Sequence, residues 1–189
     1  MQTTDTLRAE HEGVLLVLDQ LERAVAAAER GAPLPTDVFR DIQEFFSVFV
    51  DRCHHGKEEA ALFPRLMAHG LSAIAQRLED EHTLGRRLAA AYGRAVAEYA
   101  PGQATSGVRL AAAARAYAGF LREHIDLETR ELFPAVEATL AEDDQVLTDA
   151  FERVEIERIG AGTHERLHGM LDGLAARIDA YVRAGAGDR

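Results

Sequence analysis

Hydrophobic residues recur at intervals of three and four along most of the chain, a spacing that is typical of amphipathic helices. Turn-forming residues divide this pattern into four long stretches and a shorter C-terminal part. The long stretches begin near Thr3, Thr36, Ser72 and Thr105, and they end near Gly31, Gly70, Pro101 and Ala141. No stretch shows the alternation of a β-strand. The pattern therefore predicts an all-α chain, built as an antiparallel four-helix bundle with an additional C-terminal helical segment.

The two halves of the predicted bundle resemble each other in sequence. The offset between matching residues is 71 or 70, as seen for His11 and His82 (82 − 11), His54 and His124 (124 − 54), and Pro64 and Pro134 (134 − 64). We therefore expect residues 1–141 to form one bundle of two pseudo-repeats, at about 1–70 and 71–141. Residues 142–189 have no counterpart in the repeat. We expect them to form a short helix and a final helix, capped by Asp143-Asp144 and by Thr163, that pack on the outside of the bundle.

The clearest part of the repeat is an eleven-residue motif that occurs once in each half. HHGKEEAALFP at 54–64 and HIDLETRELFP at 124–134 both read H-x-x-x-E-x-x-x-L-F-P. Residues four apart lie on one face of an α-helix, so His54 with Glu58, and His124 with Glu128, point in the same direction. Pro64 is expected to kink or end its helix.

The hydrophobic stripes contain six residues that can bind a metal, which are His11, His54, Glu58, His82, His124 and Glu128. Hydrogen-bonded core histidines or histidine–carboxylate salt bridges are the structural alternatives. A buried carboxylate is costly unless it is paired or binds a metal, and the duplicated pattern favours the metal. Four imidazoles and two carboxylates exceed one tetrahedral zinc site and are too rich in nitrogen for calcium or magnesium. Bridging carboxylates with imidazoles suit a pair of iron or manganese ions.

Composition narrows the classes of partner. The net charge of −11 and the pI near 5.2 argue against binding to nucleic acid or to an anionic membrane surface. No apolar run reaches the ~20 residues of a membrane-spanning helix, and the N-terminus does not read as a secretory signal. The single cysteine, Cys53, excludes an internal disulfide framework and a cysteine-based zinc cluster. We expect a cytoplasmic protein, as a monomer or homodimer.

The order H…HxxxE…H…HxxxE, over residues 5–140, resembles the hemerythrin-like proteins with HHE cation-binding domains. The resemblance implies a centre of two non-haem iron ions, bridged by oxo or hydroxo oxygen and held in a four-helix bundle. Such a centre is expected to bind O2, NO or peroxide in oxidative or nitrosative stress or in iron handling, and peroxide decomposition is a candidate activity. A non-catalytic iron store or sensor is the alternative, and a purely structural bundle is a third. Ferritin-like sites fit poorly because they use Glu-x-x-His pairs.

One position departs from the oxygen-carrying hemerythrins, which have a second histidine one turn after the third-helix ligand. Arg86 stands there, so the resemblance favours redox, sensing or iron-handling roles over oxygen carriage. His164 or His168 on the final helix is a candidate replacement, with an ordinary surface position as the alternative. The same two histidines form an HExxH pattern, but no third zinc ligand of the zincin type follows it.

A second H-x-x-x-E pair, His55 and Glu59, lies one residue out of phase with His54 and Glu58. Its counterparts in the other half are Ile125 and Thr129, so the repeat selects His54 and Glu58 as ligands. Glu59 is then either a residue that orients a ligand or an exposed carboxylate.

Overall fold

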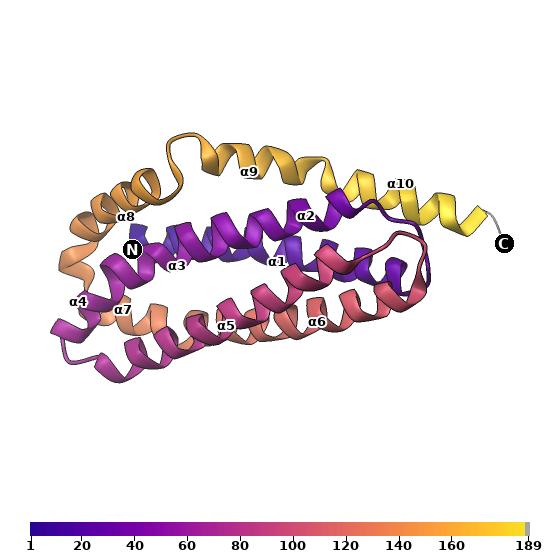
Figure 1. Ribbon diagram of the computed structural model, residues 1–189. Coiled ribbons are helices and arrows are strands. Elements are labelled where there is room, and N and C mark those ends of the chain that lie inside the picture. Colours follow the sequence, from indigo (N-terminus) through magenta and orange to yellow (C-terminus); the bar gives the residue numbers. More distant parts are fainter. Residues whose placement is uncertain (188–189) are drawn as a thin grey trace.

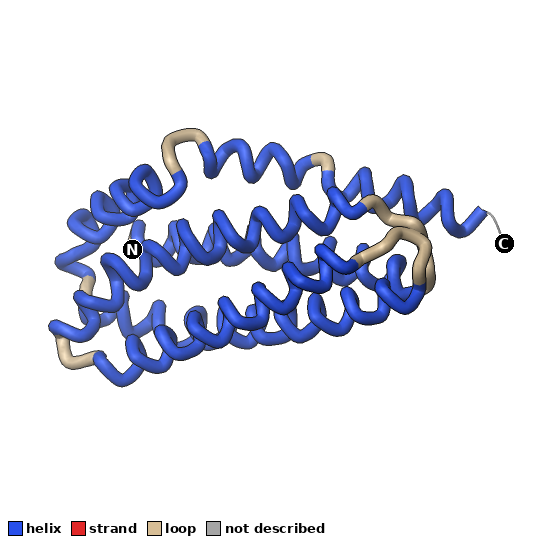
Figure 2. The backbone as a smooth tube through the Cα atoms, in the orientation of Figure 1, coloured by secondary structure: helices blue, strands red, loops and turns tan. Residues whose placement is uncertain are grey.

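The computed structural model describes residues 1–187, without the side chains of residues 165, 168, 171, 172 and 184–187. Every regular element within this part of the chain is helical, and no β-strand occurs in it (Figure 2). The prediction of an all-helical chain is confirmed.

Four long helical segments account for residues 2–139. They are α1 (Gln2–Glu29); a second segment of α2 (Thr36–Phe45), η1 (Phe46–His54), α3 (His55–Lys57), η2 (Glu58–Leu62) and α4 (Phe63–Ala68); α5 (Ser72–Glu98); and a fourth of α6 (Ala104–Leu127), η3 (Glu128–Leu132) and α7 (Phe133–Thr139). The chain reverses its direction at each connection between them (Figure 1). α6 packs against both α1 and α5, and α5 also packs against α2.

The buried apolar residues form two clusters, one towards each end of the long segments. On α1, Leu7 belongs to one cluster and Val14 to the other, and His11 lies between them. The same order holds for the histidines of the other three segments, since each lies in sequence between residues of the two clusters. A buried polar layer is therefore enclosed on both sides by hydrocarbon.

Three stretches of these helices are wound as π-helix, and all three adjoin or contain the repeated motif. They are η1 (Phe46–His54), η2 (Glu58–Leu62) and η3 (Glu128–Leu132). A π-turn closes its hydrogen bond over five residues instead of four, and such turns often occur at functional sites. The π-turns also explain the positions of Pro64 and Pro134 in these helices.

Of the two effects expected of Pro64, a kink or the end of its helix, the second does not occur. Pro64 and Pro134 occupy the first turns of α4 and α7, directly after the π-turns, and α4 continues to Ala68. A change from π to α winding leaves one N–H without a helical acceptor, so a residue that lacks this donor fits there. The segment ends instead at Gly70, whose φ of 82° suits glycine.

The C-terminal helices differ from the expectation in one cap and in the division of the final helix. Asp144 does not cap its own helix with its side chain, because its carboxylate accepts hydrogen bonds from the backbone N–H groups of Gln2 and Thr3 at 2.9 and 3.0 Å. The negative charge thus stabilises the N-terminus of α1. The expected final helix is divided at Gly173 into α9 (Thr163–Asp172) and α10 (Leu174–Gly187), and glycine is a poor helix former.

The C-terminal helices lie along the first two segments (Figure 1). α8 (Asp144–Ile159) follows a single 3₁₀ turn, η4 (Ala141–Asp143), and packs on α1, η1 and α3. α10 packs on α1 and α2, where Arg177 donates to Asp37 and Asp41 at 2.9 and 2.5 Å. Among the described residues, no helix has the length and apolar character needed to span a membrane.

The contact between α1 and α6 predicts a large effect of a small substitution. A Cβ atom on Gly107 would overlap the carbonyl oxygen of Ala28. We expect Gly107→Ala to lower the free energy of unfolding by about 1–3 kcal/mol, because the two backbones must separate. Gly119, also on α6, faces open space, so Gly119→Ala should raise stability by about 0.5–1 kcal/mol. Urea denaturation of both variants measures the difference, and a Gly107→Ala protein as stable as Gly119→Ala would contradict this packing.

Candidate metal centre

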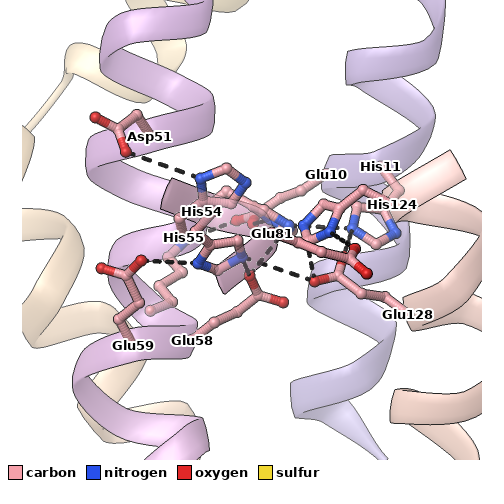
Figure 3. Close-up of polar contacts among 12 residues, drawn as sticks. Glu10, His11, Asp51, His54, His55, Glu58, Glu59, Glu81, His124 and Glu128 are labelled. Carbon is pink, nitrogen blue, oxygen red and sulfur yellow. Dashed lines mark hydrogen bonds and ion pairs between the residues drawn. The ribbon is translucent and has the colours of Figure 1, made fainter. Parts of the chain in front are cut away.

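Seven buried side chains converge in the polar layer between the two apolar clusters (Figure 3). All six residues singled out in the sequence are among them, and the seventh is His55. None of the seven exposes more than 4% of its surface. They are His11 of α1, His54 of η1, His55 of α3, Glu58 of η2, His82 of α5, His124 of α6 and Glu128 of η3.

The imidazoles fall into two groups. His55, His82 and His124 form one, in which the rings of His55 and His82 stack at a centroid distance of 3.8 Å and those of His82 and His124 are 5.0 Å apart. His11 and His54 form the other, with their Nε2 atoms 3.0 Å apart. The candidate ligand atoms of the first group, and those of the second together with Glu128, each lie within 4.8 Å of one another.

The two carboxylates lie between these groups of imidazoles. Glu128 Oε2 is 3.0 Å from His11 Nε2, while its Oε1 is 3.2 Å from His124 Nε2. Glu58 Oε2 is 3.3 Å from His82 Nε2 and 3.8 Å from His54 Nε2. Each carboxylate therefore reaches both groups, as a bridge between two metal ions would.

Most of the short distances at the centre are not hydrogen bonds, and the contact between Nε2 of His11 and Nε2 of His54 is the exception. Both carboxylate oxygens of Glu58 and of Glu128, Nε2 of His82 and of His124, and both ring nitrogens of His55 have no hydrogen-bond partner among the described residues. Buried polar atoms without partners are rare, because each loses its interaction with water. These atoms without partners lie close together at the centre of the cluster. Two cations of the right size placed among these atoms would satisfy them.

The outer nitrogens of three histidines are, by contrast, bound to carboxylates. His54 Nδ1 donates to Glu10 at 2.7 Å, His82 Nδ1 to Glu59 at 2.7 Å and His124 Nδ1 to Glu81 at 2.9 Å. Each such bond places the hydrogen on Nδ1 and directs the lone pair of Nε2 to the centre. Carboxylates of this kind commonly fix the tautomer and orientation of metal-binding histidines.

These outer contacts follow the sequence repeat. Glu10 and Glu81 precede the matching histidines His11 and His82, and each of them binds the histidine of the other segment in its own half. Glu59 has no equivalent in the second half, where Thr129 stands. Correspondingly, Nδ1 of His11 has no hydrogen-bond partner among the described residues.

A family model for the hemerythrin HHE cation binding domain matches residues 2–136, which is more than half of the chain. The chain belongs to this family. The resemblance noted in the sequence is thereby confirmed, and membership implies that the domain binds metal cations. The matched range contains all seven residues of the cluster and their outer carboxylates, whereas α8, α9 and α10 lie beyond it. Searches of curated proteins and of solved structures found no match.

Without a metal cation, protonated imidazoles balance the negative charge of the carboxylates in this cluster of the HHE domain. Burial disfavours the charged imidazole, but the carboxylates of Glu128, Glu58 and Glu59 raise the pKa of His82 to about 11. Burial also opposes the charge of His124, and Glu128 and Glu81 nevertheless raise its pKa to about 9. Protons on these imidazoles thus neutralise the buried carboxylates, in the place that metal cations would take.

His55 behaves in the opposite way. Burial, together with the neighbouring imidazoles of His82, His54 and His124, holds the pKa of His55 well below its usual value. Its ring is therefore neutral near pH 7, and a lone pair is free for a metal.

The repeat gives no indication that His55 lies in the cluster, because its counterpart is Ile125. The helix that carries His54 is π-wound up to that residue, and a π-turn contains more residues than an α-turn, so consecutive side chains diverge by a smaller angle. His54 and His55 can therefore both reach the centre. The out-of-phase pair His55 and Glu59 was the available signal: His55 lies in the cluster, and Glu59 orients His82.

The other positions considered in the sequence lie elsewhere. Arg86 donates to Asp51 and Glu59 at 2.6 and 2.7 Å, so it acts on the outer shell of the cluster and not at its centre. His164 lies 3.5 Å from Glu155, next to the ring of Phe49, and it belongs to none of the three metal-ligand groups of the central cluster. The side chain of His168 lies outside the described part of the structure.

Lys57 connects the cluster to the C-terminal helices. Its ammonium group donates to Glu10 at 2.5 Å and to Glu155 of α8 at 2.8 Å, and Glu10 in turn holds His54. These contacts lower the pKa of Glu10 to about 2 in spite of its burial. Cys53 lies beside this network, and burial raises the pKa of its thiol to about 12, so the thiol is neutral.

The buried position of Lys57 predicts a large loss of stability when its charge is removed. Lys57→Met leaves the Glu10 carboxylate without its ammonium partner, and both side chains are almost fully buried. We expect a loss of about 3–5 kcal/mol in the free energy of unfolding. Arg130→Met, which breaks the exposed Arg130–Asp126 pair, is the control and should cost at most about 1 kcal/mol. Equal losses in denaturant titrations of the two variants would contradict a structural role for the buried lysine.

Proposed function

We propose that the four long segments form the antiparallel four-helix bundle of a non-haem di-iron protein, with five histidines and two glutamates as ligands. The observation that carries this proposal is the contrast between inner and outer atoms of the cluster. The outer nitrogens of three histidines are fixed by carboxylates, while the oxygens of both glutamates and Nε2 of His82 and His124 crowd together without hydrogen bonds. A cluster held by salt bridges alone would be expected to satisfy these buried atoms with hydrogen bonds.

The donor set supports a pair of similar ions. His11 and His54 would bind one, and His55, His82 and His124 the other, with Glu58 and Glu128 between them. Five nitrogens and four carboxylate oxygens do not saturate two six-coordinate ions. Positions thus remain for a bridging oxygen and for one small external ligand, and the end with two histidines has fewer protein ligands. His55 supplies the fifth imidazole that Arg86 does not, so no histidine of α9 is needed.

Imidazole with bridging carboxylate is a ligand combination that suits a pair of iron ions, whereas calcium and magnesium prefer oxygen ligands, and the donors exceed one tetrahedral zinc site. When bound, an iron pair would supply one-electron and two-electron redox chemistry and an affinity for O2, NO or peroxide. The residues of the chain have three tasks around it. Glu10, Glu59 and Glu81 orient the ligands, the two apolar clusters exclude water, and the phenyl rings of Phe63 and Phe133 stack on His82 and His11 at 5.5 and 5.3 Å.

The physiological role that fits such a centre is a response to oxidative or nitrosative stress, or the handling of iron, in the cytoplasm. Redox turnover of peroxide is the enzymatic form of this role. The alternative is a non-catalytic iron store or sensor, in which occupancy of the site is the signal. Oxygen evolution from peroxide by the iron-loaded protein would favour the enzyme; its absence, with iron retained, would favour the store or sensor.

The ligand assignment predicts a loss of metal on removal of a bridging carboxylate. Wild-type protein purified in air should contain two irons per chain and show oxo-to-iron charge-transfer bands. Glu58→Ala should lose at least one iron, because both ions share that carboxylate. Elemental analysis measures the content, and circular dichroism verifies that the variant is folded. A stable, colourless and metal-free wild-type protein would rule out the proposed centre.

The fifth imidazole has a test of its own. His55→Ala should lower the iron content or shift the charge-transfer bands, because the group with three histidines becomes a group with two. His69→Ala is the matched control, since His69 lies at the end of α4, where its ring bonds the carbonyl oxygen of Arg65 at 2.9 Å. Unchanged iron content and spectrum in His55→Ala would return the ligand set to the six residues found from sequence.

A further inference from the structure

A cavity of about 210 Å³ lies on the outer side of His55, between the second segment and α5. Its deep wall includes His55, Phe46, Tyr92 and Tyr117, all of which are buried. Asp51 and Arg86, which are about two-fifths exposed, line it nearer the surface. His55 therefore separates this cavity from the centre of the candidate metal site.

Two polar groups in the deep wall have no partner in the described residues. Tyr117 is 3% exposed and its hydroxyl makes no hydrogen bond there, whereas Tyr92 donates to the carbonyl oxygen of Phe39 at 3.1 Å. His55 Nδ1 is likewise without a hydrogen bond, and it lies 3.8 Å from Asp51 Oδ1 (Figure 3). That separation is too long for a direct bond. A hydroxyl group between them can accept from one and donate to the other.

The charges in the cavity are already compensated. Asp51 accepts from Arg86 at 2.6 Å, and the second guanidinium contact of Arg86 goes to Glu59 at 2.7 Å. A charged ligand would have to break these pairs and lose its own hydration. The wall thus favours an uncharged molecule.

The size of the cavity sets the size of its occupant. The small residues Gly85 and Ala89 of α5 line the cavity. A cavity of roughly 150 Å³ accommodates a benzene molecule. The aromatic wall and the slightly larger volume therefore fit one six-membered ring with one substituent.

We propose that this cavity binds an uncharged, single-ring organic molecule with one hydroxyl group, held by Tyr117 and by the His55–Asp51 pair. Contact between this molecule and a metal-bound His55 rests on the proposed function. The binding of the molecule does not, because the cavity and its polar groups are formed by the chain alone.

The test is calorimetric titration of the full chain, iron-loaded and iron-depleted, with phenol as the probe. Phenol is uncharged at pH 7, and benzoate provides a charged ring of similar size. We expect phenol to bind at least tenfold more tightly than benzoate. Ala89→Leu, which fills the cavity, should weaken phenol binding at least tenfold, and Ala97→Leu on an exposed position of α5 should leave it unchanged. Equal binding of phenol by both leucine variants would overturn the proposal.

A second variant keeps the test decisive if Ala89→Leu fails to fold. Tyr117→Phe removes only the hydroxyl group, so it should weaken phenol about threefold to tenfold and leave the binding of benzene unchanged. An equal effect on both probes would contradict a hydrogen bond to Tyr117. Phenol should also shift the charge-transfer bands of the iron-loaded protein. Binding without such a shift overturns the link to His55, and failure to bind in a protein that retains iron overturns this proposal alone.

Discussion

The arrangement of this protein depends on two carboxylates that are buried between two layers of hydrocarbon. Glu58 and Glu128 have no exposed surface, and their oxygens have no hydrogen-bond partner in the described residues. Such groups are among the most unfavourable in a protein interior unless cations compensate them. The histidines around these carboxylates complete a set of donor atoms that could hold such cations.

The polar layer is held in place from outside. The outer carboxylates fix three imidazoles, and Lys57 ties one of these carboxylates, Glu10, to α8. Arg86, on α5, holds a second outer carboxylate, that of Glu59. A set of ion pairs thus surrounds the central cluster, and part of it comes from a helix that lies beyond the family match. The C-terminal segment therefore contributes to the environment of the site, although it supplies none of the seven residues of the central cluster.

The two halves of the cluster are alike in their repeat and unlike in their surroundings. His55 breaks the symmetry, because it adds a third imidazole on one side and forms the wall of the neighbouring cavity. On the other side His11 has no outer carboxylate, since Thr129 replaces the equivalent of Glu59. The duplicated sequence has thus given a cluster whose two ends differ in the number of donor atoms, and a cavity adjoins the end that contains His55.

The sequence by itself determined the helical class, the four long segments, the family and six of the seven central residues. These features follow from local spacing: apolar residues at three and four mark helices, and His-x-x-x-Glu places two donors on one face. Only the tertiary structure decided the inward direction of His55, the cap of α1 by Asp144 and the connection of Lys57 to α8. Each depends on helix winding or on partners more than forty residues away, and the spacing of residues along one helix does not fix either.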